Sequence, residues 1–377
     1  MRSQRKNYSK YPNLFIYSSE QFCGNNEKYF SHHCEKLVVF IIQPRLKNSG
    51  NKVRLYRYGE LVEEKTIALS QNIFLYYLLW YSTYIKMLFH YFSFNEKFYV
   101  ISFHPLNSFG IGIIQLLRHV KIIYWIGDYF PANGNFPVLL YEKLKRYLNS
   151  KLQYVCYLGD GINKIMNGKI INTKNKKTIL WGVDPKNIKH TKITTNKRHT
   201  ILFIGQIHKE QGLSYFIDFL KVYKNYSLQI LGVCPKEYYN ELKQLIKKNE
   251  VTKQVFFPNK FFSDEEVQKI AKKCDIGIAL YSTSDKITTF YTDPGKVKAY
   301  AELGIPVIMS DTSAVAPYIK KFKSGEVIPV INNQTLTDAL TLIFSNYNLY
   351  RKGLEKFNKY FYYEDYYGKH FKFLESL

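Results

Sequence analysis

Short apolar runs alternate with helix-like segments along this chain, and that alternation limits the folds open to it. In the first half, runs rich in Val, Ile, Phe and Tyr have the length of strands and lie at 13–19, 37–42, 98–105, 121–131 and 153–160. Helical patterns at 111–119 and 141–148 separate the later runs. Strands that alternate with helices form parallel sheets with helices on both faces. The sequence therefore predicts an α/β fold of the doubly wound type.

The alternation stops at a polar, basic stretch, residues 182–199, and then begins again. Further strand-like runs lie at 199–206, 226–233, 254–259, 274–282 and 306–309, and Ser263 and Glu266 are spaced as a capping box before one of the intervening helices. A chain of 377 residues is too long for one ordinary core. We expect four parts: a first domain at 1–181, a linker at 182–199, a second domain at 200–350, and a helical tail at 351–377 that packs back on the first domain.

Polar residues follow several of the predicted strands. In open parallel sheets, ligands bind beyond the carboxyl ends of the strands. His104 and Asp128 stand there in the first domain, and Gly205, Gln206 and Tyr281 in the second. His104 and Asp128 are also consistent with simple loop caps before the prolines that follow them, so both interpretations stay open.

The sequence Asp293-Pro294-Gly295-Lys296 stands where a helix is expected to begin. Asp293 is predicted as the N-cap and Pro294 as the first helical residue. Gly295 would let a ligand approach the free backbone amides, and Lys296 adds a cation, a combination that suits a phosphate group. The same four residues are consistent with an ordinary capped helix packed on a sheet. The turn alone therefore does not distinguish a phosphate site from a structural helix start.

Positive charge is concentrated in the first half. Residues 1–200 contain 30 Lys and Arg against 11 Asp and Glu, whereas residues 201–377 contain 24 against 19. This asymmetry points to an anionic partner, which is a nucleic acid, a membrane surface or a phosphorylated ligand, unless the lysines are only solvated surface residues. No nucleic-acid-binding motif accompanies the charge, so we expect no nucleic-acid partner.

Two further features bear on location. The five cysteines are scattered without a Cys-x-x-Cys pair, and the basic, polar N-terminus is not typical of a secretory signal, so we expect a cytoplasmic protein with reduced thiols. His32-His33-Cys34 is not expected to bind a metal, because adjacent side chains do not converge on one ion from a regular element. The aromatic segment 72–92 contains Lys86 and His90, which favour a buried or interfacial helix over a membrane span.

Four blocks of the second half resemble the donor domain of GT-B glycosyltransferases, particularly glycosyltransferase family 4. They are ILFIGQIHKEQGL, CDIGIALYS, DPGKVKAYAELGIPVIMSD and SGEVIPV, and their order and spacing agree over about residues 199–330. The first half is more divergent, although YWIGDYFP and QYVCYLGDGINKIM are similar to the pattern of these enzymes. The resemblance implies a GT-B fold, in which two Rossmann-like domains face a central cleft.

The resemblance also implies an activity. It is the transfer of a hexose, with retention and without a metal or other cofactor, from a nucleotide sugar to a glycan or lipid-linked acceptor. We expect a peripheral association with an anionic membrane and a role in cell-surface polysaccharide or glycoconjugate synthesis. The alternative is a catalytically silent GT-B protein that serves as partner or scaffold of an active transferase.

Strand ends and the resemblance together give a set of candidate site residues. His104, Asp128 and Asp293 are the candidate catalytic residues. The candidate donor-binding residues are Gly205, Gln206, Lys209, Gln211, Gly212, Tyr281, Thr292, Asp293, Pro294, Gly295, Lys296 and Glu302.

The chain departs from the family pattern at the expected clamp of the diphosphate. The family typically has Gly-Arg-x-x-x-x-Lys-Gly, and this chain has Gln206 and Gln211 in place of both cations. A charge-assisted hydrogen bond contributes about 1.5–3 kcal/mol, so the loss of both cations should weaken binding of the donor diphosphate. Lys209 and Lys296 are expected to supply replacement charge.

A second departure concerns the two Glu residues that the family carries with seven residues between them, the second of which holds the ribose hydroxyls. Tyr291 and Ala299 occupy these positions here, and neither can do that work. Glu302 lies one turn beyond Ala299 and is a candidate replacement, or simply a solvated helix residue.

Overall fold

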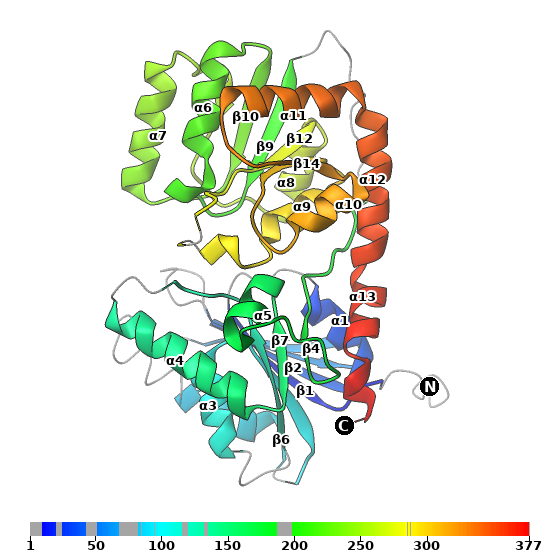
Figure 1. Cartoon of the computed structure of the whole chain (residues 1–377). Coiled ribbons are helices and arrows are strands. Elements are labelled where there is room, and N and C mark those ends of the chain that lie inside the picture. Colours follow the sequence, from blue (N-terminus) through cyan, green and yellow to red (C-terminus); the bar gives the residue numbers. More distant parts are fainter. Residues whose placement is uncertain are drawn as a thin grey trace. The chain divides into compact units, whose positions relative to one another are not determined.

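The computed structural model describes residues 10–19, 25–42, 51–67, 82–83, 85–93, 95–114, 120–131, 135–186, 198–284, 286 and 288–376 (Figure 1). Two compact units divide the chain. Unit 1 comprises Met1–Gly182 with Tyr363–Leu377, and unit 2 comprises Val183–Tyr362. The C-terminal helices are therefore divided between the units after residue 362.

Unit 1 is built on an eight-stranded sheet of order β4-β3-β2-β1-β5-β6-β7-β8. Its strands are β1 (Leu14–Ser19), β2 (Lys36–Ile42), β3 (Asn51–Arg57), β4 (Glu60–Ile67), β5 (Phe98–Ser102), β6 (Val120–Ile126), β7 (Tyr154–Tyr157) and β8 (Lys176–Thr178). Its helices are α1 (Asn26–His33), α3 (Pro105–Ile114), α4 (Phe136–Lys151), α5 (Asp160–Asn167) and α13 (Tyr363–His370). Buried apolar side chains of β5 and β6, where all but one residue is buried, form the centre of the sheet.

The sheet of unit 1 is parallel except at one edge. Strands β2, β3 and β4 pair antiparallel, and the other neighbours pair parallel. The turn between β3 and β4 places Tyr58 and Gly59 at positive φ, as a tight two-residue hairpin turn requires. The sequence did not predict either strand, because buried residues of β3 alternate with polar ones and most residues of β4 are exposed. The sequence Asn48-Ser49-Gly50-Asn51, whose composition predicts a polar hairpin turn, lies outside the described residues except for Asn51.

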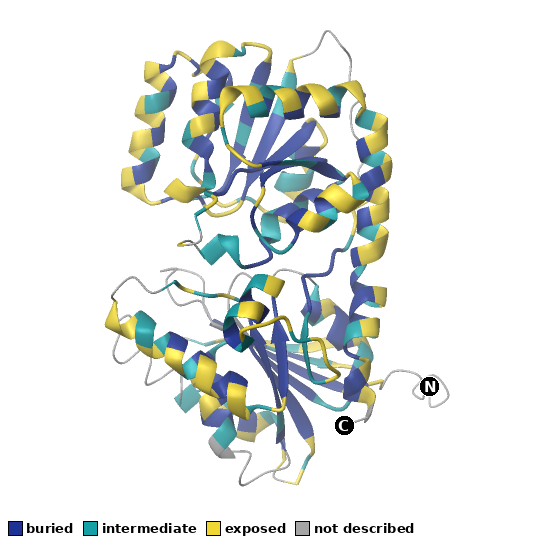
Figure 2. Cartoon of the chain, in the orientation of Figure 1, coloured by how far each residue is buried: buried dark blue, intermediate teal, exposed yellow. Residues whose placement is uncertain are grey.

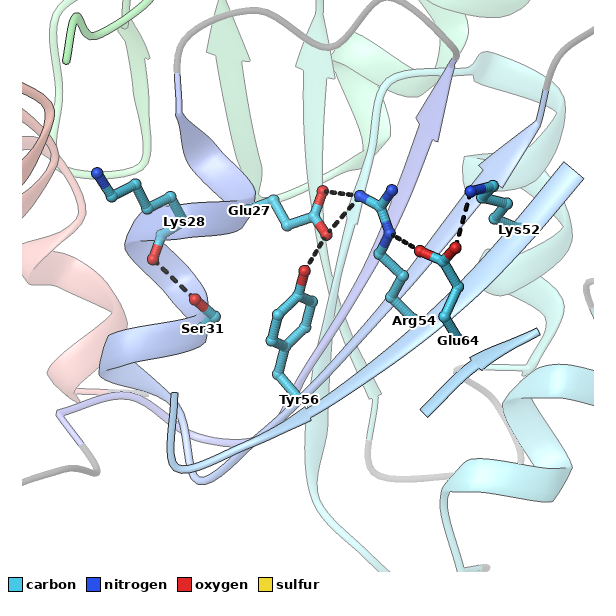
Figure 3. Close-up of polar contacts among 7 residues, drawn as sticks. All are labelled: Glu27, Lys28, Ser31, Lys52, Arg54, Tyr56 and Glu64. Carbon is cyan, nitrogen blue, oxygen red and sulfur yellow. Dashed lines mark hydrogen bonds and ion pairs between the residues drawn. The ribbon is translucent and has the colours of Figure 1, made fainter. Parts of the chain in front are cut away.

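A polar network holds this hairpin against α1 (Figure 3). The Arg54 guanidinium donates to Glu27 of α1 at 3.1 Å and, through Nε, to Glu64 of β4 at 2.6 Å. The Tyr56 hydroxyl also donates to Glu27, at 2.6 Å, and Lys52 donates to Glu64, at 2.7 Å. One arginine thus joins the antiparallel edge to the helix that precedes β2.

Unit 2 has a six-stranded, wholly parallel sheet of order β11-β10-β9-β12-β13-β14. Its strands are β9 (His199–Ile204), β10 (Tyr226–Leu231), β11 (Val255–Phe256), β12 (Ile276–Ala279), β13 (Val307–Ser310) and β14 (Gly325–Ile328). Its helices are α6 (Leu213–Val222), α7 (Lys236–Lys248), α8 (Asp264–Ala271), α9 (Gly295–Glu302), α10 (Ala316–Phe322), α11 (Asn333–Ser345) and α12 (Tyr347–Phe361). The predicted capping box is confirmed, since Ser263 and Glu266 exchange both hydrogen bonds at the start of α8.

In both units the central strands are buried and the helices carry exposed residues on their outer sides, whereas the edge strand β4 of unit 1 is largely exposed (Figure 2). Two α/β domains with largely parallel sheets are thus confirmed. Of the aromatic segment 72–92, the structure describes residues 82–83 and 85–92, and within that part Leu88 and Phe92 are buried in the core of unit 1. No helix among the described residues is long and apolar enough to span a bilayer.

Candidate functional site

The turn between β9 and α6 holds five of the predicted donor residues. Gly205 has φ +101° and Gly212 has φ +67°, backbone conformations that favour glycine. A Cβ on Gly212 would lie 2.4 Å from the carbonyl oxygen of Leu280, just after β12. Gly205 and Gln206 are exposed on the outer side of the turn. The turn therefore packs closely on one strand end and presents its other side for contact.

Helix α9 begins one residue later than predicted. Pro294 is the N-cap, with extended backbone and no side-chain cap, and Gly295 is the first helical residue. The prediction that Asp293 caps the helix was wrong. Asp293 is 2% exposed, and its Oδ2 lies 3.6 Å from the Nζ of Lys298. Removal of a carboxylate from water requires a compensating partner, and Lys298 inside the fold provides one.

Lys298 is itself held inside unit 2. Its Nζ lies 3.2 Å from the ring centroid of Phe361 on α12, and its side chain is 3% exposed. Burial lowers the pKa of Lys298 to about 8, and Asp293 opposes that shift. Thr292, next to Asp293, is buried as well. The residues that precede α9 are thus fixed from the inside of the domain.

Lys296 connects the two turns. Its Nζ donates to the Gln211 Oε1 at 3.2 Å, across 85 residues of sequence, and lies 3.7 Å from the ring centroid of Phe203 at the end of β9. The ring of Tyr281 lies 5.4 Å away. Burial lowers the pKa of Lys296 well below its usual value. The structure therefore brings together Gln211, Tyr281 and Lys296 at the carboxyl ends of two neighbouring strands.

A cavity of about 410 Å³ lies beside this group, between the β9–α6 turn and the segment after β12. Lys209 and Gly212 line it, as does a set that sequence reasoning missed: Glu210, Tyr215, Leu280, Ser282, Thr283, Val330 and Ile331. The amide of Ser282 donates to the carbonyl of Glu210 at 2.9 Å, which holds the two walls together. The sequence gives no strong signal for these residues, because small hydroxyl and apolar side chains occur throughout the chain.

Two of the predicted donor residues are committed to other partners. Lys209 Nζ lies 2.8 Å from the Glu241 carboxylate, in a pair whose side chains are 63% and 52% exposed. The Glu302 carboxylate accepts a hydrogen bond from the Asp184 amide at 2.8 Å. Lys296 is therefore better placed than Lys209 to supply the missing charge, and Glu302 is occupied in joining the start of unit 2 to α9.

In unit 1, His104 and Asp128 stand just beyond β5 and β6, as predicted. His104 precedes α3, and its ring centroid lies 5.4 Å from that of Tyr141 on α4. Burial, reinforced by Lys145, lowers the pKa of His104 to about 4, so the imidazole is neutral near pH 7. The Asp128 side chain is exposed, yet the surrounding protein raises the pKa of its carboxyl, an effect that Lys145 opposes.

A buried ion pair that sequence reasoning missed supports this corner. Lys145 Nζ donates to Glu142 at 2.7 Å and to the backbone carbonyl of Asp128 at 2.6 Å, while Glu142 accepts from the Phe130 amide at 3.1 Å. The two side chains are 3% and 10% exposed. Burial lowers the pKa of Lys145, and Glu142 opposes the shift. The pair fixes the backbone of residues 128–130. It therefore also fixes the position from which the Asp128 side chain extends.

No group of three or more His, Cys, Asp or Glu side chains is arranged to hold a metal ion in the described part of the chain. Within the His32-His33-Cys34 segment, the His33 imidazole instead hydrogen-bonds to the Glu364 carboxylate, and Cys34 is buried. The pair of His33 with Glu364 thus joins α1 to α13.

The sequence and fold of unit 2 match known proteins. A family profile described as Glycosyl transferases group 1 matches residues 185–360. The C-terminal half is a family 4 glycosyltransferase domain. Members of this family transfer a sugar from a nucleotide-sugar donor, typically without a metal. No curated protein sequence matches the chain.

Solved structures extend the likeness in fold to both units of the chain. Sucrose-phosphate synthase from Thermosynechococcus elongatus has a TM-score of 0.69 at 10% identity, over 94% of this chain and 96% of that one. HepE from Anabaena, in complex with UDP-glucose, has a TM-score of 0.68 at 13% identity, over 97% and 100%. The lipopolysaccharide outer core galactosyltransferase WaaB has a TM-score of 0.61 at 16% identity, over 96% and 99%. The chain thus has the GT-B fold.

Within the family 4 domain, the structure clarifies the departures from the usual pattern. Gln211 stands at the usual lysine position, and the ammonium of Lys296 lies against its side-chain oxygen. The side-chain nitrogen of Lys296, from another part of the chain, therefore lies beside the residue that stands at the lysine position of the pattern. Gln206 has no such substitute among the contacts described above.

Proposed function

We propose that this protein is a retaining, metal-independent hexosyltransferase that binds a nucleotide sugar in unit 2 and transfers its sugar to a glycan or lipid-linked acceptor. The observation that carries the proposal is the convergence of Lys296 and Gln211 beside the N-terminus of α9 and the β9–α6 turn. Free amides at a helix N-terminus and an adjacent ammonium stabilise negative charge. In glycosyl transfer that charge develops on the departing diphosphate, which makes this the place where stabilisation lowers the barrier.

Each site residue has a proposed role. Lys296 and the amides of Gly295 and Lys296 would bind the diphosphate, and the cavity beside Gly212 would receive the nucleoside. Asp293, fixed by Lys298, would hold the donor sugar. His104 and Asp128 would act on the acceptor, with His104 as a neutral imidazole.

The second candidate is a catalytically silent member of the family that binds an active transferase. Gln206, Tyr291 and Ala299 favour it, since each replaces a side chain that the family uses on the donor. The two candidates differ in whether the protein binds and cleaves a donor.

Two measurements distinguish the active transferase from the silent family member. They are a donor-hydrolysis screen over common nucleotide sugars and thermal unfolding in the presence of nucleoside diphosphates. A nucleotide that binds the folded state must raise the melting temperature. We expect one donor to be hydrolysed slowly and its nucleotide to stabilise the protein. Absence of both effects across the panel would favour the silent candidate.

We also propose that the protein acts at the cytoplasmic face of an anionic membrane, in the synthesis of a cell-surface polysaccharide or glycoconjugate. The excess of 30 Lys and Arg over 11 Asp and Glu in residues 1–200 supports this, because each basic residue near such a surface contributes about 1 kcal/mol. Binding to anionic vesicles should weaken with salt, since the Debye length falls from about 10 Å at 0.1 M to about 3 Å at 1 M. Equal binding to neutral and anionic vesicles would remove the electrostatic argument.

A further inference from the structure

Helix α4 carries large apolar residues on its outer side as well as on its inner side. Its buried residues are Glu142, Lys145, Leu148 and Asn149, whereas Phe136 is 74% exposed, Leu140 58% and Tyr147 50%. A helix on the surface of a globular domain normally turns its apolar residues toward the core. The exposed apolar residues of α4 are therefore not explained by the packing of unit 1.

These exposed residues form one stripe. Phe136, Leu140, Lys143 and Tyr147 follow the spacing i, i+4, i+7, i+11, which keeps them on one face of an α-helix. Figure 2 shows exposed residues along the outer side of α4. The neighbouring helix α3, which contacts α4, adds Leu106 and Phe109, 44% and 45% exposed.

The exposed charged side chains of α4 all have one sign. Lys143, Arg146 and Lys151 are exposed on α4, and its one acidic residue, Glu142, is buried against Lys145. Exposed rings and aliphatic side chains interleaved with basic residues suit the headgroup boundary of an anionic bilayer, where the rings enter the interface and the cations meet lipid phosphates. A protein partner that covered so apolar a face would not require this uniform positive charge.

We propose that the α4 stripe, Phe136, Leu140, Lys143, Tyr147 and Lys151, docks unit 1 on the surface of an anionic phospholipid bilayer. The stripe adjoins the loop that carries Asp128, because Lys145 and Glu142 tie that loop to the inner side of the same helix. Docking would hold the acceptor side of unit 1 next to the membrane. This inference rests on the membrane association proposed above, which it assigns to named residues, and it does not depend on the identity of the donor or the acceptor.

The test is co-sedimentation of the full chain with vesicles of phosphatidylcholine alone or with phosphatidylglycerol. The variant Phe136→Ser with Leu140→Ser removes the apolar part of the stripe, and we expect its partition onto anionic vesicles to fall by at least about tenfold. A matched control, Val222→Ser with Phe261→Ser, removes two side chains of unit 2 that are 60% and 63% exposed and should bind as the wild type does.

The basic part of the stripe has its own variant. Lys143→Glu with Lys151→Glu should also reduce binding by at least about tenfold. Its control is Lys247→Glu with Lys248→Glu, the same charge change at two exposed positions of α7. Since all of these positions are exposed, thermal unfolding should be little changed, and the charge variant keeps the test valid if the apolar variant does not fold.

Three outcomes would overturn the proposal. They are the absence of wild-type binding to anionic vesicles, equal loss in the stripe variants and their controls, and wild-type binding by Phe136→Ser with Leu140→Ser. Sedimentation velocity without lipid would show whether the stripe instead joins two copies, in which case self-association would be lost in that variant. Nucleotide-dependent thermal stabilisation, measured in parallel, should persist in every variant, so failure of docking and failure of donor binding are distinguishable.

Discussion

Replacement of Lys296 by methionine tests the donor site most directly. Methionine preserves the length of the side chain and its contact with Phe203, and removes only the charge. A charge-assisted hydrogen bond to phosphate contributes about 1.5–3 kcal/mol, which corresponds to roughly 10–150-fold in Kd. The free ammonium already interacts with Phe203 at 3.7 Å and with Gln211 at 3.2 Å, so part of that energy is offset. We therefore expect the low end, about a tenfold rise in Kd.

Isothermal titration with the nucleoside diphosphate that stabilises the protein most would measure this change. Lys209→Met is the matched control, because Lys209 is 63% exposed and paired with Glu241. Surface pairs contribute about 0–1 kcal/mol, so the control should change Kd by no more than about fivefold. A folded Lys296→Met variant with wild-type affinity, or a larger effect from Lys209→Met, would refute the assignment of Lys296 as the phosphate cation.

The same residue gives a pH dependence. Burial lowers the pKa of Lys296, so its charged fraction in the free protein falls as pH rises. A bound diphosphate favours the charged form, so nucleotide binding should take up protons and weaken from pH 7 to 8.5. Titrations in buffers of different ionisation enthalpy would reveal the proton uptake, and Lys296→Met should show neither the uptake nor the slope. An affinity of the wild type that rises over this range would contradict the sign.

Three further predictions concern the rest of the site. Asp128→Asn and His104→Ala should each lower transfer more than donor hydrolysis, and near wild-type transfer by both variants would show that neither residue is catalytic. Gly212→Ala combines a left-handed φ with a close backbone contact and should cost about 2–4 kcal/mol in thermal unfolding, whereas Gly205→Ala, with open space at its Cβ, should cost only about 1–2. Lys298→Met leaves the buried Asp293 carboxylate without its cation and should lower the free energy of unfolding by about 3–5 kcal/mol. Adding Asp293→Asn removes the unpaired charge and should restore most of that stability.

The sequence by itself determined most of the strands and the identity of the second domain. Strands such as β1, β2, β9 and β13 are apolar runs, and a buried parallel strand must be apolar on both faces, so its signal is local. The family blocks likewise depend on short contiguous stretches. The hairpin β3–β4 was not predicted, because buried residues of β3 alternate with polar ones and most of β4 faces water, so neither strand is a continuous apolar run.

Only the tertiary structure decided which polar residues act together. Gln211 and Lys296 lie in contact because β9 and β12 are neighbours in the sheet. The local sequence of neither segment predicts that contact. The sequence predicts Asp293 as a helix cap, yet its side chain is buried because Lys298 of α9 lies next to it inside the domain. The exposed apolar side of α4 was equally hidden, because apolar residues occur around this helix and only the fold decides which of them meet the core.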